Sequence, residues 1–408
     1  MSRPPRVAFM ADSFHEINGA ARTCRELQAY ASRKQLPFLS IHGGEKTSFT
    51  VNGSVQVLEL ERSKLSIPVD ADLKFDPLFY KQRELVEEKL REFQPDLVHL
   101  TSPGDIGILG AIAADDLKVP LVLSWHTNLH EFAARRFAKV FRWAPSGLVQ
   151  PLAQKIEDLI LGRVVWFFGR GKVLMAPSPE LVELLESRTG RPTLYMGRGV
   201  DTKTFSPEQR DREDDVFTIG YVGRLMPEKN VRFLAKLEQE LEKAGHTDFR
   251  IVMVGDGMEK AWLGKNIKRG RLTGILLGDD LGREYANFDA FAFPSRTDTF
   301  GQVIQEAHSS GVPTVVTNHG GPQFLVEPGK TGFVAQSDEE FVEHIIRLKG
   351  DPELRERMGQ ESRRQCYIKC WDRTFVETYK AYELSKPLPP GMPTAYKAGE
   401  LVPQPVQN

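Results

Sequence analysis

Short apolar runs alternate with stretches of helical periodicity along the first half of the chain. The runs lie at 6–12, 38–44, 55–61, 97–103 and 121–127, and helical patterns lie at 19–34, 77–93 and 105–116. Strands that alternate with helices need crossover connections, so this pattern predicts a mainly parallel sheet with helices on both faces. The first half is therefore predicted to be a Rossmann-like domain.

The same alternation begins again at VFTIGYVG, residues 216–223, and continues to TGFVAQ at 331–336. Further strands are predicted at 249–257, 271–277, 290–295 and 313–318, with helices at 230–244, 259–265, 279–287 and 300–310. Helices at 338–349, 352–368 and 371–384 complete the pattern. We predict an α/β chain with two Rossmann-like, doubly wound parallel-sheet domains that face each other across a cleft.

Changes in composition mark the predicted domain limits. The segment from Pro192 to Asp215 contains the charge-rich run PEQRDREDD, which is typical of a hinge and not of a core. We predict an N-terminal domain at 1–205, a C-terminal domain at 206–370 and a helix at 371–385 that packs back toward the N-terminal domain. The Pro-rich tail, 386–408, is predicted to be disordered.

Composition and charge exclude several classes of protein. The 408 residues contain 54 Lys plus Arg and 55 Asp plus Glu. The chain therefore lacks the net positive charge by which most nucleic-acid-binding proteins attract their ligand, and nucleic acid is not an expected partner. Three cysteines are too few for a disulfide framework, which favours the cytoplasm. The most apolar stretch, 159–168, is far shorter than the ~20 residues of a membrane span, and the N-terminus lacks a signal-peptide pattern.

The loop GRLMPEKN, residues 223–230, is the first candidate for binding chemistry. Ligands bind beyond the carboxyl ends of parallel strands, which is where this loop is predicted to lie. Arg224 and Lys229 precede an amphipathic helix, and two cations together with the free amides of a helix start suit a diphosphate. A solvated loop of two cations is the alternative.

The second candidate, SRTDTFGQVIQEA at 295–307, combines two carboxylates with a helix start. Apolar residues recur at helical spacing from Phe300, so we expect the helix to begin near Thr299. Asp298 would then lie at the helix start, with Glu306 about 12 Å farther along the axis at ~1.5 Å per residue. One carboxylate can reach the sugar of an extended nucleotide sugar while the other reaches its ribose. Each carboxylate alone is also explained as an ordinary helix residue.

These motifs resemble those of the retaining glycosyltransferases of family 4, which have the GT-B fold. In the second half the resemblance is carried by GRLMPEKN, FDAFAFPS, SRTDTFGQVIQEAHSSGVPTVVT and GGPQFLVEPGKTGFVA. In the first half, DSFHEINGAART, LSWHTNLHEF and GRGVDTKTFSP are similar to the branch of GDP-mannose-dependent α-mannosyltransferases and lipid glycosyltransferases. The resemblance spans about residues 6–384 and implies an acceptor-side domain at 1–205 and a nucleotide-sugar-binding domain at 206–370.

The resemblance implies roles for four charged residues of the second half. Arg224 and Lys229 match the pair that holds the donor diphosphate and stabilises the departing nucleotide. Asp298 matches the acidic position that contacts the donor sugar, where Asp replaces the commoner Glu and shortens the reach by one methylene. Glu306 matches the acidic position that binds ribose.

Four further positions match the family motifs. Phe300 and Gly301 match backbone elements near the diphosphate, and Gly19 matches the glycine that lets the backbone approach the donor phosphate. His126 matches the histidine near the transferring sugar and completes a predicted catalytic set with Arg224, Lys229 and Asp298. The resemblance also implies a front-face substitution in which the leaving phosphate helps to take the acceptor proton.

No metal or other cofactor is expected, apart from the nucleotide sugar as co-substrate. His126 and His130 have the i, i+4 spacing of metal ligands, but no third ligand is adjacent. Asp70-Ala71-Asp72 resembles the metal-binding DxD motif of another glycosyltransferase fold, yet it lies far from the matched motifs. We interpret both patterns as structural or solvated residues.

The acceptor is left open by the sequence as a lipid or a glycan. Drawn as a helix, 130–143 has one apolar half and one cationic half, formed by Phe132, Phe137, Val140, Phe141 and Trp143 and by Arg135, Lys139 and Arg142. This pattern suits an interfacial helix and equally an ordinary half-buried one. Peripheral contact with the inner face of a membrane is therefore an alternative to a purely cytoplasmic location.

The function predicted is transfer of a hexose, with retention, from GDP-mannose or a UDP-hexose to an acceptor hydroxyl. A nucleotide-sugar epimerase of the same fold and a non-catalytic sugar-nucleotide-binding protein are the alternatives. A nucleotide-binding dehydrogenase is disfavoured because GxGxxG follows none of the predicted strands.

Overall fold

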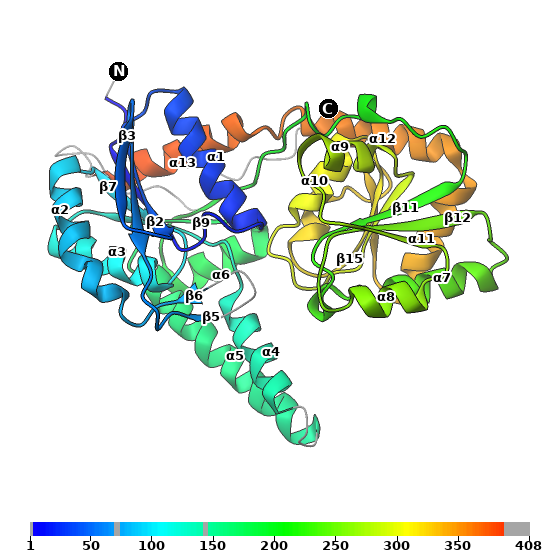
Figure 1. The fold of residues 1–408 in the computed structure, drawn as a ribbon, viewed down its shortest axis with the longest axis horizontal. Coiled ribbons are helices and arrows are strands. Elements are labelled where there is room, and N and C mark those ends of the chain that lie inside the picture. The colour runs from blue at the N-terminus through cyan, green and yellow to red at the C-terminus, as the bar shows by residue number, and fades with distance from the viewer. Residues whose placement is uncertain (1–2, 69–73, 142–145, 387–408) are drawn as a thin grey trace. The chain divides into compact units, whose positions relative to one another are not determined.

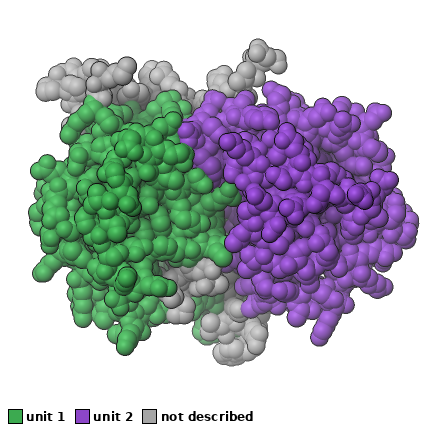
Figure 2. Space-filling model, turned by 45° about the horizontal axis from the view of Figure 1, so that its top comes forward, with its two compact units in different colours: residues 1–197, 375–408 green, residues 198–374 purple. Residues whose placement is uncertain are grey.

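The computed structural model describes residues 3–68, 74–141 and 146–386. It divides the chain into two compact units (Figure 2). Unit 1 runs to Gly197 and takes up the chain again from Phe375, and unit 2 is Arg198–Thr374. The boundary between the two units, after Gly197, thus lies a few residues before the domain boundary predicted at 205. The reason is that the Val200 amide donates to the Lys369 carbonyl and Phe205 is buried in the core of unit 2.

Unit 1 is built on an eight-stranded sheet in the order β10-β9-β8-β7-β1-β2-β4-β3, parallel except for β3. Its strands are β1 Val7–Ala11, β2 Phe38–Gly44, β3 Ser48–Asn52, β4 Val55–Glu61, β7 Leu97–Leu100, β8 Leu121–Ser124, β9 Val173–Ala176 and β10 Thr193–Tyr195, and β5 Ile67–Pro68 pairs separately with β6 Lys74–Phe75. The central strands are buried along their whole length, as a sheet covered on both faces requires.

Helices follow most strands of unit 1 (Figure 1). They are α1 Gly19–Arg33, η1 Phe79–Gln82, α2 Arg83–Phe93, α3 Asp105–Asp116, α4 Leu129–Val140, α5 Ser146–Phe168 and α6 Pro179–Thr189, joined by α13 Trp371–Ser385 from Phe375 onward. The aromatic side chains of α13 pack on α1, with the Phe375 and Tyr30 ring centroids 5.4 Å apart. The end of the predicted tail, 387–408, lies outside the described residues.

Unit 2 has a six-stranded, fully parallel sheet in the order β13-β12-β11-β14-β15-β16. The strands are β11 Phe217–Val222, β12 Phe249–Val254, β13 Gly270–Gly274, β14 Ala290–Phe293, β15 Thr314–Thr317 and β16 Gly332–Ala335. The helices are η2 Pro207–Gln209, η3 Pro227–Lys229, α7 Phe233–Lys243, α8 Lys260–Asn266, α9 Gly278–Ala286, α10 Gln302–Ser309, η4 Gly321–Leu325, α11 Asp338–Gly350 and α12 Pro352–Cys366.

Each sheet has one place where the chain order reverses. In unit 1 the first strand, β1, lies between β2 and β7, and in unit 2 the first strand, β11, lies between β12 and β14. The loops that leave neighbouring strands at such a point diverge to opposite faces and leave room for a ligand at the carboxyl edge. These two places are where each unit is expected to bind.

The hydrophobic pattern does not predict one long stretch of unit 1. Helix α5, strand β9 and helix α6 follow one another there, and α4 and α5 lie side by side and project from the sheet (Figure 1). The burial pattern of α5 combines a buried face with exposed apolar residues, which blurs its period in the sequence. Among the described helices, none has the length and apolarity needed to cross a bilayer.

Candidate active site

The reversal point of unit 2 brings together the two loops that the sequence singled out. One loop follows β11 and the other follows β14, and these strands are neighbours. Three contacts tie the loops: Lys229 Nζ to Asp298 Oδ1 at 2.6 Å, the Thr297 hydroxyl to the Glu228 carbonyl at 3.1 Å, and the Asn230 amide to the Pro294 carbonyl at 3.3 Å. The cation of the first loop and the first carboxylate of the second therefore form one polar centre.

The carboxylate of Asp298 is held ionised in this centre. Burial by itself would raise the pKa of Asp298, but the ammonium of Lys229, with a smaller contribution from Arg224, lowers it below the usual value. The Ser295 hydroxyl also lowers this pKa, yet the second oxygen, Oδ2, is buried and accepts no hydrogen bond of good geometry from the described residues. A buried carboxylate oxygen without a donor is costly in a finished structure, so Oδ2 is suited to accept from a ligand hydroxyl.

Arg224 lies at the start of the same loop. Its carbonyl accepts a hydrogen bond of 3.0 Å from the hydroxyl of Tyr221, and its guanidinium lies 3.6 Å from Glu228 Oε1. Burial, with the nearby charge of Asp298, raises the pKa of Tyr221 well above its usual value, so the phenol is a permanent donor that fixes the loop backbone. The Arg224 side chain remains partly exposed, as a group that meets a ligand must be.

The start of helix α10 differs from the prediction. The helix begins at Gln302 and not near Thr299, with Gly301 before it in the left-handed region at φ 90°. A Cβ atom at Gly301 would lie 2.9 Å from the Pro322 side chain, and the carbonyl of Asp298 accepts a hydrogen bond from the Gly321 amide. The loop is therefore packed against η4, and the helix does not extend into it. Asp298 thus precedes the helix, and the expected axial spacing to Glu306 does not apply.

Phe300 and Gly301 lie directly before the first turn of α10. The Phe300 ring is buried in the core of unit 2, with the Arg198 guanidinium 5.3 Å from its centroid. The first amides of α10 have no partner within the helix and point toward its N-terminal end, which favours an anion there. This is the arrangement that a phosphate at the loop would use.

Glu306 lies farther along α10 and is buried. Its Oε2 accepts a 3.0 Å hydrogen bond from the hydroxyl of Tyr285, which comes from α9. This burial excludes the alternative in which Glu306 is an ordinary helix residue on the surface. Tyr285, which orients the carboxylate, was not foreseen, because nothing in the local sequence connects it to Glu306.

In unit 1 the loop after β1 ends at α1, whose first residue is Gly19. The Asn18 side chain caps this helix by accepting from the Ala21 amide at 2.8 Å. Asp12, at the end of β1, accepts from the hydroxyl of Ser102 at 2.5 Å and from the Ile106 amide at 3.0 Å. Asp12 was not predicted as a site residue, although it directly follows a buried strand.

His126 follows β8 and lines a small hollow in unit 1 together with Asp12, Cys24 and Ser102. Burial, together with the charge of Asp105, raises the pKa of Asp12, so this hollow can hold a carboxyl proton near neutral pH. The ring of His126 is fixed by the hydroxyl of Ser124, 2.7 Å from its Nε2. The structure therefore puts His126 at the carboxyl edge of its sheet, near the loop that precedes Gly19.

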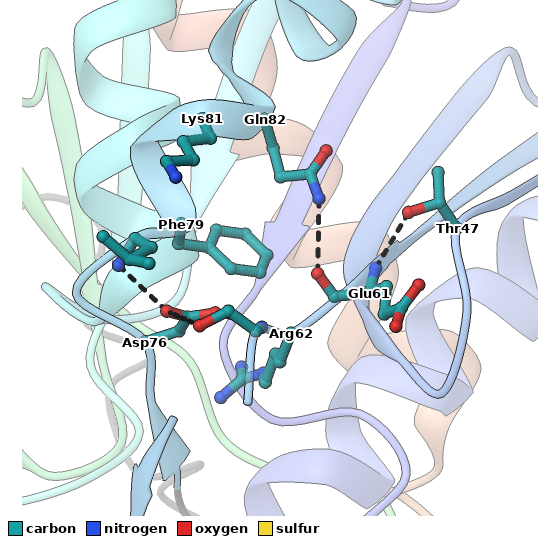
Figure 3. Close-up of a pocket in the computed structure, with 9 residues that line it drawn as sticks. Thr47, Glu61, Arg62, Asp76, Phe79, Lys81 and Gln82 are labelled. Carbon is teal, nitrogen blue, oxygen red and sulfur yellow. Dashed lines mark hydrogen bonds between the residues drawn. The ribbon is translucent and has the colours of Figure 1, made fainter. Parts of the chain in front are cut away.

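A larger polar hollow of about 250 Å³ lies beyond the end of β4 (Figure 3). Figure 3 shows Arg62, Asp76 and Phe79 beside one another in it, and Glu61 close to Thr47. Arg62 also lies 3.3 Å from Asp105, whose pKa is raised by burial. The hollow thus offers charges of both signs next to an aromatic ring.

One group of side chains among the described residues could hold a metal ion. His15, His42 and Glu59 each offer a ligand atom within 4.8 Å of the others. His15 Nε2 lies 3.1 Å from Glu59 Oε1, and burial lowers the pKa of His42 to about 4, so its ring is neutral. The DxD-like residues 70–72 lie outside the described residues.

Solved structures of other proteins have the same fold. Sucrose-phosphate synthase from Thermosynechococcus elongatus matches 93% of this chain with a TM-score of 0.70 at 17% identity, over 98% of its own length. Anabaena HepE, solved with UDP and glucose, matches 92% of this chain and 99% of its own with a TM-score of 0.61 at 17% identity. The fold is the GT-B fold of glycosyltransferases.

Sequence comparisons then identify the family. Residues 202–365 match the model of glycosyl transferases group 1, and residues 17–204 match that of glycosyltransferase family 4. The chain belongs to glycosyltransferase family 4, and the predicted resemblance is confirmed.

Several relatives are mannosyltransferases by name. The GDP-mannose-dependent alpha-mannosyltransferase of Mycobacterium tuberculosis is 31% identical over 93% of this chain and 96% of its own length. The one from Corynebacterium glutamicum is 30% identical over 81% and 77%. The protein is a glycosyltransferase, and the epimerase alternative finds no support in these relatives.

Proposed function

We propose that this glycosyltransferase moves mannose, with retention, from GDP-mannose to an acceptor hydroxyl. The observation that supports a nucleotide-sugar donor best is the Lys229–Asp298 pair of 2.6 Å at the reversal point of unit 2, which sets a cation beside a carboxylate oxygen that lacks a donor. Three relatives with 30–32% identity are named GDP-mannose-dependent, which favours mannose over the other hexoses.

In this proposal Arg224 and Lys229 bind the diphosphate, helped by the backbone at Phe300 and Gly301 of the same unit. Positive charge of this kind stabilises the transition state most, because negative charge grows on the phosphate as the nucleotide leaves. The two cations and the helix amides take the part that a metal ion plays elsewhere, so the proposed reaction needs no metal.

The carboxylates bind the two sugars of the donor. Asp298 Oδ2 accepts from a hydroxyl of the transferred hexose, and Glu306 accepts from the ribose hydroxyls. No side chain is assigned as a nucleophile. The acceptor attacks on the face that the phosphate leaves, and the departing phosphate oxygen takes its proton, so positioning and charge carry the catalysis.

A donor screen tests this function. The purified full chain is incubated with GDP-mannose, UDP-glucose and UDP-N-acetylglucosamine, and release of the nucleoside diphosphate is measured. We expect release from GDP-mannose at a rate at least about tenfold above the other two, a difference of about 1.4 kcal/mol in transition-state binding. Faster release from a UDP-sugar would overturn the choice of donor, and no release from any of them would count against the transferase site.

For the acceptor we propose a lipid-linked hydroxyl that is reached at a membrane surface. Another relative, 24% identical, is the alpha-monoglucosyldiacylglycerol synthase of Acholeplasma laidlawii. The polar hollow that contains Arg62 and Phe79 would take the polar head of such an acceptor. The predicted helix 130–143 is present as α4, but many of its side chains lie outside those described, so its amphipathic character stays a prediction.

Helix α5 supports membrane contact more directly. Leu152, Leu159 and Trp166 recur every seven residues on one face and are 49%, 62% and 65% exposed. Lys155 and Arg163, both exposed, lie on the same stripe at ~100° per residue. Apolar residues with a tryptophan and flanking cations suit the interface of an anionic bilayer.

Leu159→Glu should weaken binding to vesicles that contain anionic lipid by at least about tenfold. The substitution removes an apolar side chain that would insert into the bilayer, and it adds a negative charge that the anionic lipids repel. Co-sedimentation with phosphatidylcholine vesicles, with and without phosphatidylglycerol, measures the effect. Gln154→Glu adds the same charge on the opposite side of α5 and should bind like the unaltered protein. Equal binding by both variants would contradict the assignment of this stripe.

A further inference from the structure

A chain of four buried side chains crosses unit 1 and ends on His126. The hydroxyl of Tyr382, on α13, lies 2.8 Å from His99 Nδ1. His99 Nε2 lies 2.7 Å from the hydroxyl of Ser124, and that hydroxyl lies 2.7 Å from His126 Nε2. The chain therefore joins the C-terminal helix, two neighbouring strands and the histidine that the family motif marks.

The inner members of this chain are uncharged. Burial lowers the pKa of His99 to about 3, so its ring carries one proton at neutral pH. Burial, followed by the neighbouring Tyr379, raises the pKa of Tyr382 well above its usual value, so its hydroxyl keeps its proton. Each link is then an ordinary hydrogen bond in which one side donates and the other accepts.

The direction of the chain follows from its outer end. If His99 donated to Tyr382, the Tyr382 proton would need another acceptor, and none is found among the described residues. Tyr382 therefore donates to His99 Nδ1, which leaves the His99 proton on Nε2 to donate to Ser124. The Ser124 hydroxyl has two partners, the two histidines, so its own proton goes to His126 Nε2. The opposite direction leaves the buried Tyr382 hydroxyl proton without an acceptor among the described residues, which is costly, whereas this direction places the last proton on His126 Nδ1, in a residue that lines the hollow of Asp12 and Cys24.

We propose that this chain holds His126 as the neutral tautomer with its proton on Nδ1, and that Tyr382, His99 and Ser124 are positioning residues for sugar transfer. Both ring nitrogens are then committed, because Nε2 accepts from Ser124 and Nδ1 carries the proton. His126 cannot act as a base in this state. This inference rests on the proposed function for its use, and it explains why the departing phosphate has to take the acceptor proton.

Other titratable groups lie near His126 and bear on its protonation. Asp12 and Cys24 line the same hollow, from β1 and α1, and His130 lies on the adjoining helix α4. An ionised Asp12 would favour a charged His126, whereas the proton donated by Ser124 opposes it. A comparison between the unaltered protein and a Ser124 variant keeps these other groups constant.

The tautomer can be measured without any substrate. The full chain is labelled with ¹⁵N-histidine, and ring signals are recorded by NMR, with His126 assigned by their loss in His126→Gln. We expect a proton on Nδ1 at neutral pH, because Nε2 accepts from Ser124. In Ser124→Ala the form with the proton on Nε2 should appear beside it. A proton on Nε2 in the unaltered protein, or the same tautomer in both proteins, would overturn the proposal.

The outer end of the chain has a matched pair of variants. Tyr382→Phe removes the first donor and should let the Nε2–H form appear in the spectrum, with kcat falling about two- to tenfold, as expected for one hydrogen bond. Tyr379→Phe removes a buried hydroxyl one turn away that has no hydrogen-bond partner among the described residues, and should change neither quantity. An unchanged His126 tautomer in Tyr382→Phe would contradict the proposed series of hydrogen bonds.

The spectrum and the transfer assay separate two kinds of failure. The NMR result does not depend on donor or acceptor, so it tests the hydrogen-bond chain even if the donor proposed above is wrong. If the tautomer is as expected but His126→Gln transfers sugar at the full rate, the positioning role is overturned while the chain itself stands.

Discussion

Lys229→Ala is expected to lower kcat about a thousandfold while the protein stays folded. Removal of a single group that stabilises growing negative charge costs ~10²–10³ in rate in other enzymes. Here the loss also reaches Asp298, because the Lys229 ammonium is the main group that lowers the pKa of this buried carboxyl. Without Lys229 the pKa of Asp298 rises, and the carboxylate that accepts from the sugar is partly lost as well.

This double effect has a signature in the pH dependence. In the variant, activity should fall as pH is lowered through the raised pKa of Asp298, at pH values where the unaltered enzyme still has an ionised carboxylate. Steady-state kinetics with the donor found in the screen, repeated at several pH values, measure it. Thermal unfolding checks that the variant is folded.

Lys236→Ala is the matched control for Lys229. Lys236 pairs with Asp338 at 3.0 Å on the surface of unit 2, and it is half exposed. Surface ion pairs of this kind contribute little, so its kcat should equal that of the unaltered enzyme. A Lys229→Ala enzyme with full turnover would contradict the placement of the diphosphate.

Glu306→Gln is expected to weaken the binding of GDP about ten- to a hundredfold. Hydrogen bonds from ribose hydroxyls to a charged acceptor contribute ~1.5–3 kcal/mol, and the neutral amide loses most of that. The variant should stay folded. In the unaltered protein the Tyr285 hydroxyl donates to Glu306 Oε2 at 3.0 Å, and the amide oxygen of the variant side chain can still accept this hydrogen bond.

Isothermal titration calorimetry with GDP and UDP measures this effect directly. Glu343→Gln, on the exposed face of α11, removes the same charge away from the site and should bind like the unaltered protein. Equal affinities in Glu306→Gln and the unaltered protein would remove ribose recognition from Glu306. A loss of affinity for one nucleotide and not the other would argue against a contact with the shared ribose.

Much of the candidate site was predictable because it lies directly after strands. Arg224 and Lys229 follow β11, and Asp298 follows β14, so their place at the carboxyl edge is a local property of the chain. The start of α10 was predicted wrongly near Thr299, because the apolar period continues through Phe300. What stops the helix is the left-handed Gly301 and the packing of its loop on η4, and neither is visible in a hydrophobic pattern.

The sequence by itself determined the two parallel-sheet halves, the family and the loops that carry the charges, since periodicity and strand ends are encoded by neighbouring residues. Only the tertiary structure decided which groups meet. Lys229 and Asp298 are 69 positions apart, and Tyr382 and His99 are 283 positions apart. Such contacts set burial, pKa and the direction of hydrogen bonds, because those properties depend on what surrounds an atom in space and not on its neighbours along the chain.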